Sequence, residues 1–249
     1  MRGYWGLIMF VRKFSTVVAV VSMVCTAGFV GAAVNAAPAA ASGSSHHWYC
    51  TATDTLPMTD MTDQQMMDEA TFYPEMKGKL SKRDCRALHE DLTAARTYAS
   101  QFPTAGAAIA GGFHMIVPYL HGMGAHYIGP VGIPATVNPK QPNFLLYGGN
   151  GPDAPLVGLM WLVNSGQAPP VDGLPGGNDH WHRHPRLCLA SGIVVGDGMT
   201  DAECSAVGGL NLDTSGLWML HVWYVPGWLY RPDVFRPHHP MLMDMPPMA

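Results

Sequence analysis

Three histidines alternate with other residues in one short segment of this 249-residue chain, NDHWHRHPRLCLA at positions 178–190. Successive side chains on an extended strand point to opposite faces, so His180, His182 and His184 would lie on one face. Imidazole is a common ligand of zinc and copper, and two imidazoles on one strand face can converge on one ion. H-x-H is a short motif, and chance matches to it are common. A metal site would therefore also need ligands from elsewhere in the chain.

A single histidine interrupts the apolar segment LWMLHVWYV at positions 217–225. If this segment is a strand, His221 shares a face with Met219 and Trp223. A buried polar group without a partner costs about 1–3 kcal/mol, so a metal ion, a carboxylate or a carbonyl must satisfy the imidazole. We expect His221 to be a third ligand, with Met219 and His180 next to the site.

The segment FHMIVPYLHGMGAHYIGP, at positions 113–130, supplies the candidate for a fourth ligand. Its glycines allow the backbone to approach another group closely, and His126 follows them at the start of an extended run. We therefore expect His126 to complete the ligand set. The other histidines are expected to be hydrogen-bonded core residues (His114 and His121) or to face solvent (His46–His47 and His238–His239).

Methionine favours copper over zinc as the bound metal. The chain has 17 methionines, and the segment MLMDMPPM at positions 241–248 places several of them beside His238 and His239. Thioether and imidazole together suit copper, especially Cu(I). Methionine also fills gaps in cores, but a segment broken by prolines is not expected to be a core.

The carboxylates form no recognisable metal or catalytic motif. Asp179, beside the histidine segment, is a candidate to hold a ligand imidazole in place or to act as a general base. Asp197, Asp201 and Glu203 lack the order of a calcium-binding loop, so capping and turn roles are expected for them. The chain contains no G-x-S-x-G, no phosphate-binding loop and no dinucleotide-binding fingerprint.

Residues 1–36 have the pattern of an export signal. Basic Arg12 and Lys13 precede an apolar run at positions 17–34, and Val34-Asn35-Ala36 has the small-x-small form of a cleavage site. The alternative is an uncleaved membrane anchor, because the apolar run is nearly long enough to span a bilayer. We expect a secreted or cell-envelope protein that contacts the membrane only if this segment is retained.

Without residues 1–36 the chain keeps 11 basic and 18 acidic residues, a formal net charge of −7. This balance gives no basic patch for nucleic acid. Four cysteines remain, and an even number after export predicts two disulfides. Of the three possible pairings we expect the local one, Cys50–Cys85 and Cys188–Cys204. A bridge that closes a loop of about 15 residues stabilises the fold by about 3 kcal/mol in the chain-entropy model.

The order of the predicted elements indicates an α+β fold, a helical N-terminal part followed by an antiparallel β core that is sandwich-like or barrel-like. We expect a flexible linker at 37–48 and one globular domain at 49–237, with a His/Met/Pro-rich tail at 238–249 that forms no regular element. Within the domain, 60–117 is expected to be helical and 118–235 to be β-rich.

Local patterns locate the elements. Thr62 and Gln65 have capping-box spacing, and a helix of apolar periodicity begins at Ser81 and ends before Pro103. Asn150-Gly151 lies between two apolar, β-rich runs, which indicates a hairpin. The other expected elements are a short helix within 104–119, extended segments at 180–195 and 217–225, and a turn at 199–204 capped by Thr200 and Glu203.

Four segments in this order are similar to a family of uncharacterised exported bacterial proteins. That family carries an MG-x-HY motif, a P-x-x-L-x-Y…LVG-x-x-(Y/W) hairpin, a WH-x-H-x-x-LC segment and a terminal LHVW strand. The matching residues are Met123, Gly124, His126 and Tyr127, then Leu145, Tyr147, Leu156, Val157 and Gly158, then Trp181, His182, His184, Leu187 and Cys188, and finally Leu220, His221, Val222 and Trp223. The resemblance implies export and the same four histidines, but it names no reaction. Gly148-Gly149 replaces an acidic residue that the family pattern would have.

Three classes of function are consistent with these patterns. The first is an exported protein that binds or handles one transition-metal ion, and a closed set of four ligands would favour it. The second is a secreted metalloenzyme, for instance an oxidative one, and an open coordination position would favour that. The third is a disulfide-bonded envelope protein that binds a partner, with structural histidines; the sequence does not identify that partner.

Overall fold

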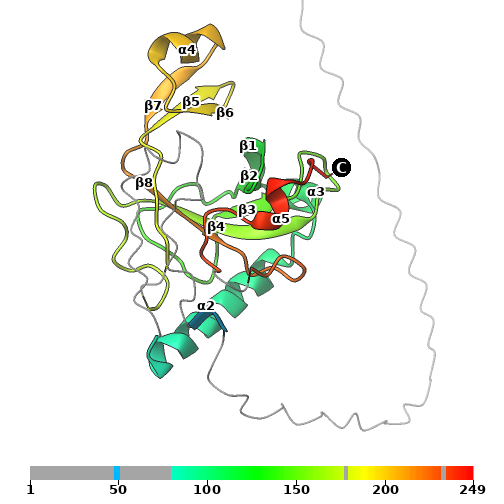
Figure 1. The fold of residues 1–249 in the computed structure, drawn as a ribbon, viewed down its shortest axis with the longest axis vertical. Helices are drawn as coiled ribbons and strands as arrows, with labels where there is room; N and C mark the ends of the chain where they lie inside the picture. Colours follow the sequence, from blue (N-terminus) through cyan, green and yellow to red (C-terminus); the bar gives the residue numbers. More distant parts are fainter. Residues whose placement is uncertain (1–47, 51–79, 177–178, 231–233, 249) are drawn as a thin grey trace, which may run out of the picture. The chain divides into compact units, whose positions relative to one another are not determined.

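We describe a computed structural model of the chain, and the residues it describes are 48–50, 80–176, 179–230 and 234–248. The predicted export signal, the helix expected from Thr62 and all but the end of the predicted linker lie outside these residues. The described part is an α+β fold, as expected, with one long helix followed by two antiparallel sheets (Figure 1). The elements in chain order are η1 (Trp48–Cys50), α2 (Lys82–Ala99), α3 (Ala105–Ala110), β1 (His114–Leu120), β2 (Gly124–Ile128), β3 (Phe144–Tyr147), β4 (Leu156–Asn164), β5 (Arg186–Ala190), β6 (Ile193–Asp197), α4 (Asp201–Ala206), β7 (Leu210–Asp213), β8 (Leu217–Val222) and α5 (Pro240–Met243).

The long helix α2 confirms the element predicted from Ser81. The Ser81 hydroxyl oxygen accepts a hydrogen bond from the backbone N–H of Asp84 at 3.1 Å and so satisfies a donor that the first turn leaves free. Leu88, Leu92 and Ala95 recur at helical spacing and are completely buried. The expected short helix is α3, but the next segment, from His114, is strand β1. The helical part of the chain therefore ends at Ala110, earlier than predicted.

Five strands form the larger sheet in the order β1-β2-β3-β4-β8, and the sheet does not close into the barrel that we considered. Its two faces have different environments. On the first face Tyr127, Leu145, Trp161 and Leu220 pack in one core with the buried residues of α2. The opposite face has its own apolar cluster, listed here in full: Ile128, Phe144, Leu146, Val157, Met160, Leu162, Met219, Trp223 and Leu242. We call this second side the histidine face, because His126 and His221 belong to it by strand alternation.

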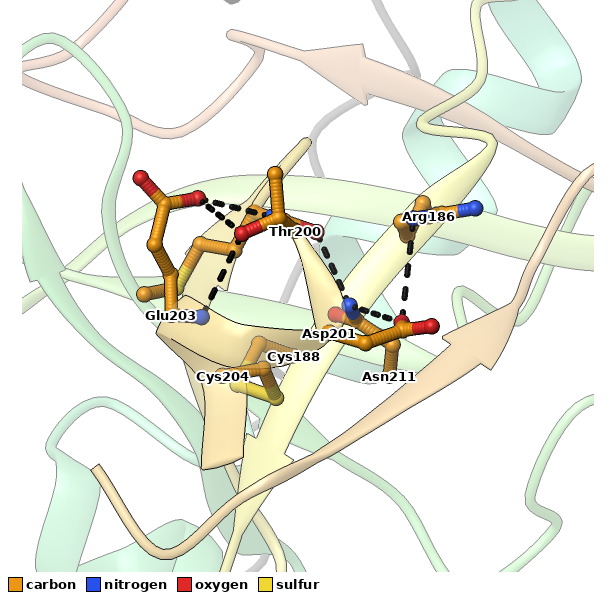
Figure 2. Close-up of polar contacts among 8 residues, drawn as sticks. Arg186, Cys188, Thr200, Asp201, Glu203, Cys204 and Asn211 are labelled. Carbon is orange, nitrogen blue, oxygen red and sulfur yellow. Dashed lines mark hydrogen bonds and ion pairs between the residues drawn. A yellow bond between two sulfur atoms is a disulfide. The ribbon is translucent and has the colours of Figure 1, made fainter. Parts of the chain in front are cut away.

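The smaller sheet, β6-β5-β7, is stapled to helix α4 by a disulfide. Cys188 on β5 is bonded to Cys204 on α4, and Cys50 is bonded to Cys85 at the start of α2, so the predicted local pairing is confirmed. Helix α4 begins with the predicted capping box between Thr200 and Glu203 (Figure 2). Gly209 leaves room for the bridge, since a Cβ there would lie 2.6 Å from Sγ of Cys188.

The C-terminal tail is more regular and more buried than the sequence suggested. Residues 240–243 form the short helix α5 with a proline in its first turn, and the His239 ring nitrogen Nδ1 accepts a hydrogen bond from the N–H of Met241 at 3.2 Å. His239 is 1% exposed, so the expectation that it faces solvent is wrong. Among the described helices none has the length and apolar character needed to cross a membrane.

We predict that Gly158→Ala destabilises the protein by about 1–3 kcal/mol through overpacking. A Cβ at this position would lie 2.6 Å from the indole of Trp223 and 3.0 Å from Leu146, and Trp223 is completely buried. Urea denaturation measures the change, with the exposed Ser205→Ala as control. An unchanged midpoint would mean that Trp223 does not pack against this strand.

Replacing Cys188 and Cys204 together by Ala should lower the free energy of unfolding by about 3 kcal/mol, because the bridge closes a loop with a sequence separation of 16 residues. Hydrogen exchange should show the loss of protection concentrated in β5, β6 and β7. Equal protection with and without the bridge would show that hydrogen bonding alone holds this sheet together.

Candidate metal centre

Two buried histidines from distant strands meet on the histidine face. Nε2 of His126 on β2 lies 3.2 Å from Nε2 of His221 on β8, and the two residues are 4% and 0% exposed. Two ligand nitrogens in a tetrahedral site with metal–nitrogen distances of about 2.0–2.1 Å are about 3.3 Å apart. The separation of the two nitrogens therefore fits either a shared proton or a shared metal ion.

The contact joins strands that are not neighbours in the sheet. Strands β2 and β8 are separated by β3 and β4, so three inter-strand steps would place them about 14 Å apart in a flat sheet. Irregular register occurs in the β1–β2 and β3–β4 pairs, and such bulges bend strands. The two imidazoles lie on the face where Gly158, which pairs with Leu146 of β3, contributes no side chain.

His182 adds a third imidazole through a one-residue extension of the sheet. Its N–H donates to the carbonyl of Met219 at 3.0 Å and its carbonyl accepts from the Met219 N–H at 2.8 Å, so its side chain lies on the histidine face. The ring centroids of His182 and His221 are 5.2 Å apart. The neighbours point the other way, as predicted: Trp181 packs in the core with α2, and the Arg183 guanidinium lies over the Trp218 ring.

His184 is the most exposed of the four predicted ligands and has a carboxylate partner. Its ring centroid is 5.7 Å from that of His182, and its Nδ1 lies 2.6 Å from Oδ2 of Asp197 on β6. A carboxylate in this position commonly orients a metal-binding histidine. Asp197, for which a capping or turn role was expected, therefore also contacts a predicted ligand. The predicted partner, Asp179, instead accepts hydrogen bonds from the backbone N–H of Leu174 and from the Trp181 indole.

These contacts select the tautomer of two of the imidazoles. Nδ1 of His184 faces a carboxylate, and Nδ1 of His182 lies 3.3 Å from the carbonyl of His180. Because both partners only accept hydrogen bonds, each Nδ1 carries the proton and each Nε2 keeps its lone pair. His180 thus acts on the site through its backbone, and its own side chain is buried.

Burial keeps the central imidazoles neutral. It lowers the pKa of His126 to about 4, with a smaller opposing effect from the backbone of Gly124. It also holds the pKa values of His182 and His221 well below the usual range, and nearby histidines add to the effect. Neutral imidazole is the form that binds metals. Nδ1 of His221 is buried without a hydrogen-bond partner, and Nδ1 of His126 makes none of normal geometry.

The imidazoles meet in pairs rather than around a single point. In the part of the chain that the structure describes, no three His, Cys, Asp or Glu side chains are arranged to enclose an ion. The contacts run from His126 to His221, then to His182, then to His184. The donor set fits a transition metal chemically, and one ion would require these rings to turn toward a common centre.

The imidazole of His238, which was expected to face solvent, is half-buried. Its charge contributes to lowering the pKa values of His126, His182 and His221. No periodicity in the proline-rich tail could have identified it. Two other expectations are wrong: His114 and His121 are exposed rather than buried, and His121 Nδ1 lies 3.0 Å from the carbonyl of Met243.

Comparisons of this chain with protein-family models, with curated proteins and with solved structures found no significant match.

We predict that Asp197→Asn weakens metal binding by about 10–100-fold, because a neutral amide holds and polarises the His184 ring less well than a carboxylate does. Competition titration of Cu(II) against a chelator of known affinity measures the change. The exposed Asp153→Asn is the matched control. Equal affinities in the two variants would mean either that His184 is not a metal ligand or that Asp197 does not help His184 to bind the metal.

Proposed function

We propose that this chain is an exported protein that binds one transition-metal ion, with copper favoured over zinc, through His126, His182, His184 and His221. The observation that carries the proposal is the buried contact between the Nε2 atoms of His126 and His221, with His182 beside them. Burial keeps the rings of His126, His182 and His221 neutral, and neutral imidazole is the form that binds metals.

Burial supports a role in holding or handling metal more than a role in catalysis. His126, His182 and His221 are each at most 4% exposed, and only the side chain of His184, at 16%, has appreciable contact with solvent. A catalytic metal needs a position open to water or substrate, whereas storage and structural sites are closed by protein ligands.

The chemistry of the ligands supports copper. Divalent copper binds a nitrogen site more tightly than the other first-row divalent ions do, and imidazole suits it. Thioethers also lie close by: Met219 pairs with His182, and Met160 belongs to the apolar cluster of the same face. The two disulfides are consistent with an oxidising compartment, which agrees with the predicted export signal.

The proposal predicts that the metal-free protein binds one equivalent of Cu(II) and becomes more stable. At a free-ion concentration one hundred times the Kd, the gain is about 2.7 kcal/mol, a rise in Tm of roughly 5–10 °C for a chain of this size. Calorimetric titration gives the stoichiometry, and differential scanning calorimetry gives the shift.

Replacing His182 and His184 together by Gln should abolish both the stoichiometric binding and the rise in Tm. The double variant His89→Gln/His114→Gln is the matched control, since His114 is exposed and His89 lies outside the site, on α2. Undiminished binding by a folded His182/His184 variant would refute the proposed site. Stronger binding of Zn(II) than of Cu(II) would retain the site and overturn the choice of metal.

A further inference from the structure

We propose that a cavity on the other side of the large sheet binds a small, neutral aromatic molecule of the phenol class. The cavity has a volume of about 180 Å³ and is lined by residues of α2, of the loop between β2 and β3, and of β4. Trp161 and Val163, its buried residues on β4, belong to the core on the side away from the histidine face. This cavity is therefore separate from the proposed metal site.

The loop that forms much of the wall is fixed at both ends and in its middle. Residues 129–143 connect β2 to β3, and a connection of this length without regular structure often carries a function. The N–H of Gly129 donates to the carbonyl of Asn143 at 2.8 Å and so joins the two ends. The Trp161 indole N–H donates to the carbonyl of Asn138, also at 2.8 Å, and attaches the middle to β4.

Prolines stiffen this loop. It contains Pro130, Pro134, Pro139 and Pro142, and the pyrrolidine ring fixes the φ angle of each. All but Pro139 line the cavity. A site that is formed before its ligand arrives loses less conformational entropy on binding, so the stiff wall favours a ligand site.

The lining favours a ligand that is aromatic and uncharged. The rings of Tyr98, Phe113 and Trp161 line the cavity, and aromatic rings pack favourably against another ring edge-to-face or offset. Among the described residues no charged side chain lines it. Lys140 belongs to the same loop, but its ammonium lies 4.0 Å from a carboxylate oxygen of Asp91. The cavity thus offers an ionic ligand no compensation for its lost hydration.

The volume and the polar groups of the lining specify the ligand further. An apolar cavity of about 150 Å³ in another protein binds benzene, so about 180 Å³ holds one ring with a small substituent. Thr136 and Asn138 are exposed and Gln141 is half-buried, and all three belong to the lining. A phenol can therefore place its ring among the buried apolar groups and its hydroxyl beside these polar side chains.

Isothermal titration calorimetry of the full chain with para-cresol tests this proposal. We expect one molecule to bind with a Kd of about 1 mM or lower. Its ring-saturated analogue should bind roughly threefold to tenfold more weakly, because the contacts between aromatic rings are lost. No measurable binding is expected for para-toluate, which carries a carboxylate in place of the hydroxyl.

A variant that fills the cavity should weaken the binding of para-cresol. Val137 is half-buried and lines the cavity, so Val137→Phe should lower the affinity about tenfold or more. The matched control is Val195→Phe, because Val195 on β6 is exposed and lies outside the cavity. Val131→Trp, at an exposed part of the lining, replaces Val137→Phe if that variant does not fold. Nuclear magnetic resonance should show a shift of the Trp161 indole N–H signal when para-cresol is added.

The outcomes test the cavity and the class of ligand separately. Binding of para-cresol that does not saturate, or equal affinities in Val137→Phe and Val195→Phe, would overturn the cavity as a ligand site. Equal binding of para-cresol and para-toluate would overturn the choice of a neutral ligand, and equal binding of the saturated analogue the choice of an aromatic one. The variant with His182 and His184 replaced by Gln should bind para-cresol with unchanged affinity, so this site and the metal site can fail independently.

Discussion

The arrangement of this protein depends on the contact between two imidazoles in an apolar environment. A neutral histidine loses its hydrogen bonds to water when it is buried, and that loss must be compensated within the protein. His126 and His221 compensate each other through their Nε2 atoms, at 3.2 Å, but Nδ1 of His221 is left without a partner. The proposed metal ion would use the Nε2 lone pairs of both rings, and each Nδ1 would then carry the proton of its neutral ring.

Several features of the fold serve this contact. The imidazoles of β2 and β8 meet across two intervening strands, β3 and β4, whose pairing contains an irregularity of register. The absence of a side chain at Gly158 allows the Trp223 indole to lie against the backbone, where it stacks on His221. The small sheet supplies Asp197, which orients His184, and the Cys188–Cys204 bridge holds that sheet together. Trp223 and Asp197 thus each contact one histidine of the proposed ligand set.

Local sequence patterns were sufficient to predict the elements that are determined by residues close together in the sequence. The apolar repeat and the Ser81 cap predicted α2, and the run of bulky apolar side chains predicted β8. The even number of cysteines after the export signal, with the choice of the local pairing, predicted both disulfides. The alternation in HWHRH correctly predicted that Trp181 and Arg183 lie on the opposite side from His182, the residue of this segment that pairs with β8. Each of these features depends on residues that are close together in the sequence, so a pattern in the sequence can predict it.

The remaining parts depend on contacts between distant residues. Strand β1 contains Pro118, which a sheet accepts here because β1 is an edge strand, and edge position is not visible in the sequence. Asp197 reaches His184 only after β5 and β6 have paired, and its spacing resembles that of a turn residue. His239 lies among prolines, and it is buried next to Leu242, which packs on the histidine face.

The most direct test is the metal content of the protein purified from the exported fraction without chelators and without a histidine tag. Mass spectrometry of the elements should find close to one equivalent of copper per chain. The account would be contradicted by protein that carries no transition metal as isolated and whose Tm does not change when copper or zinc is added.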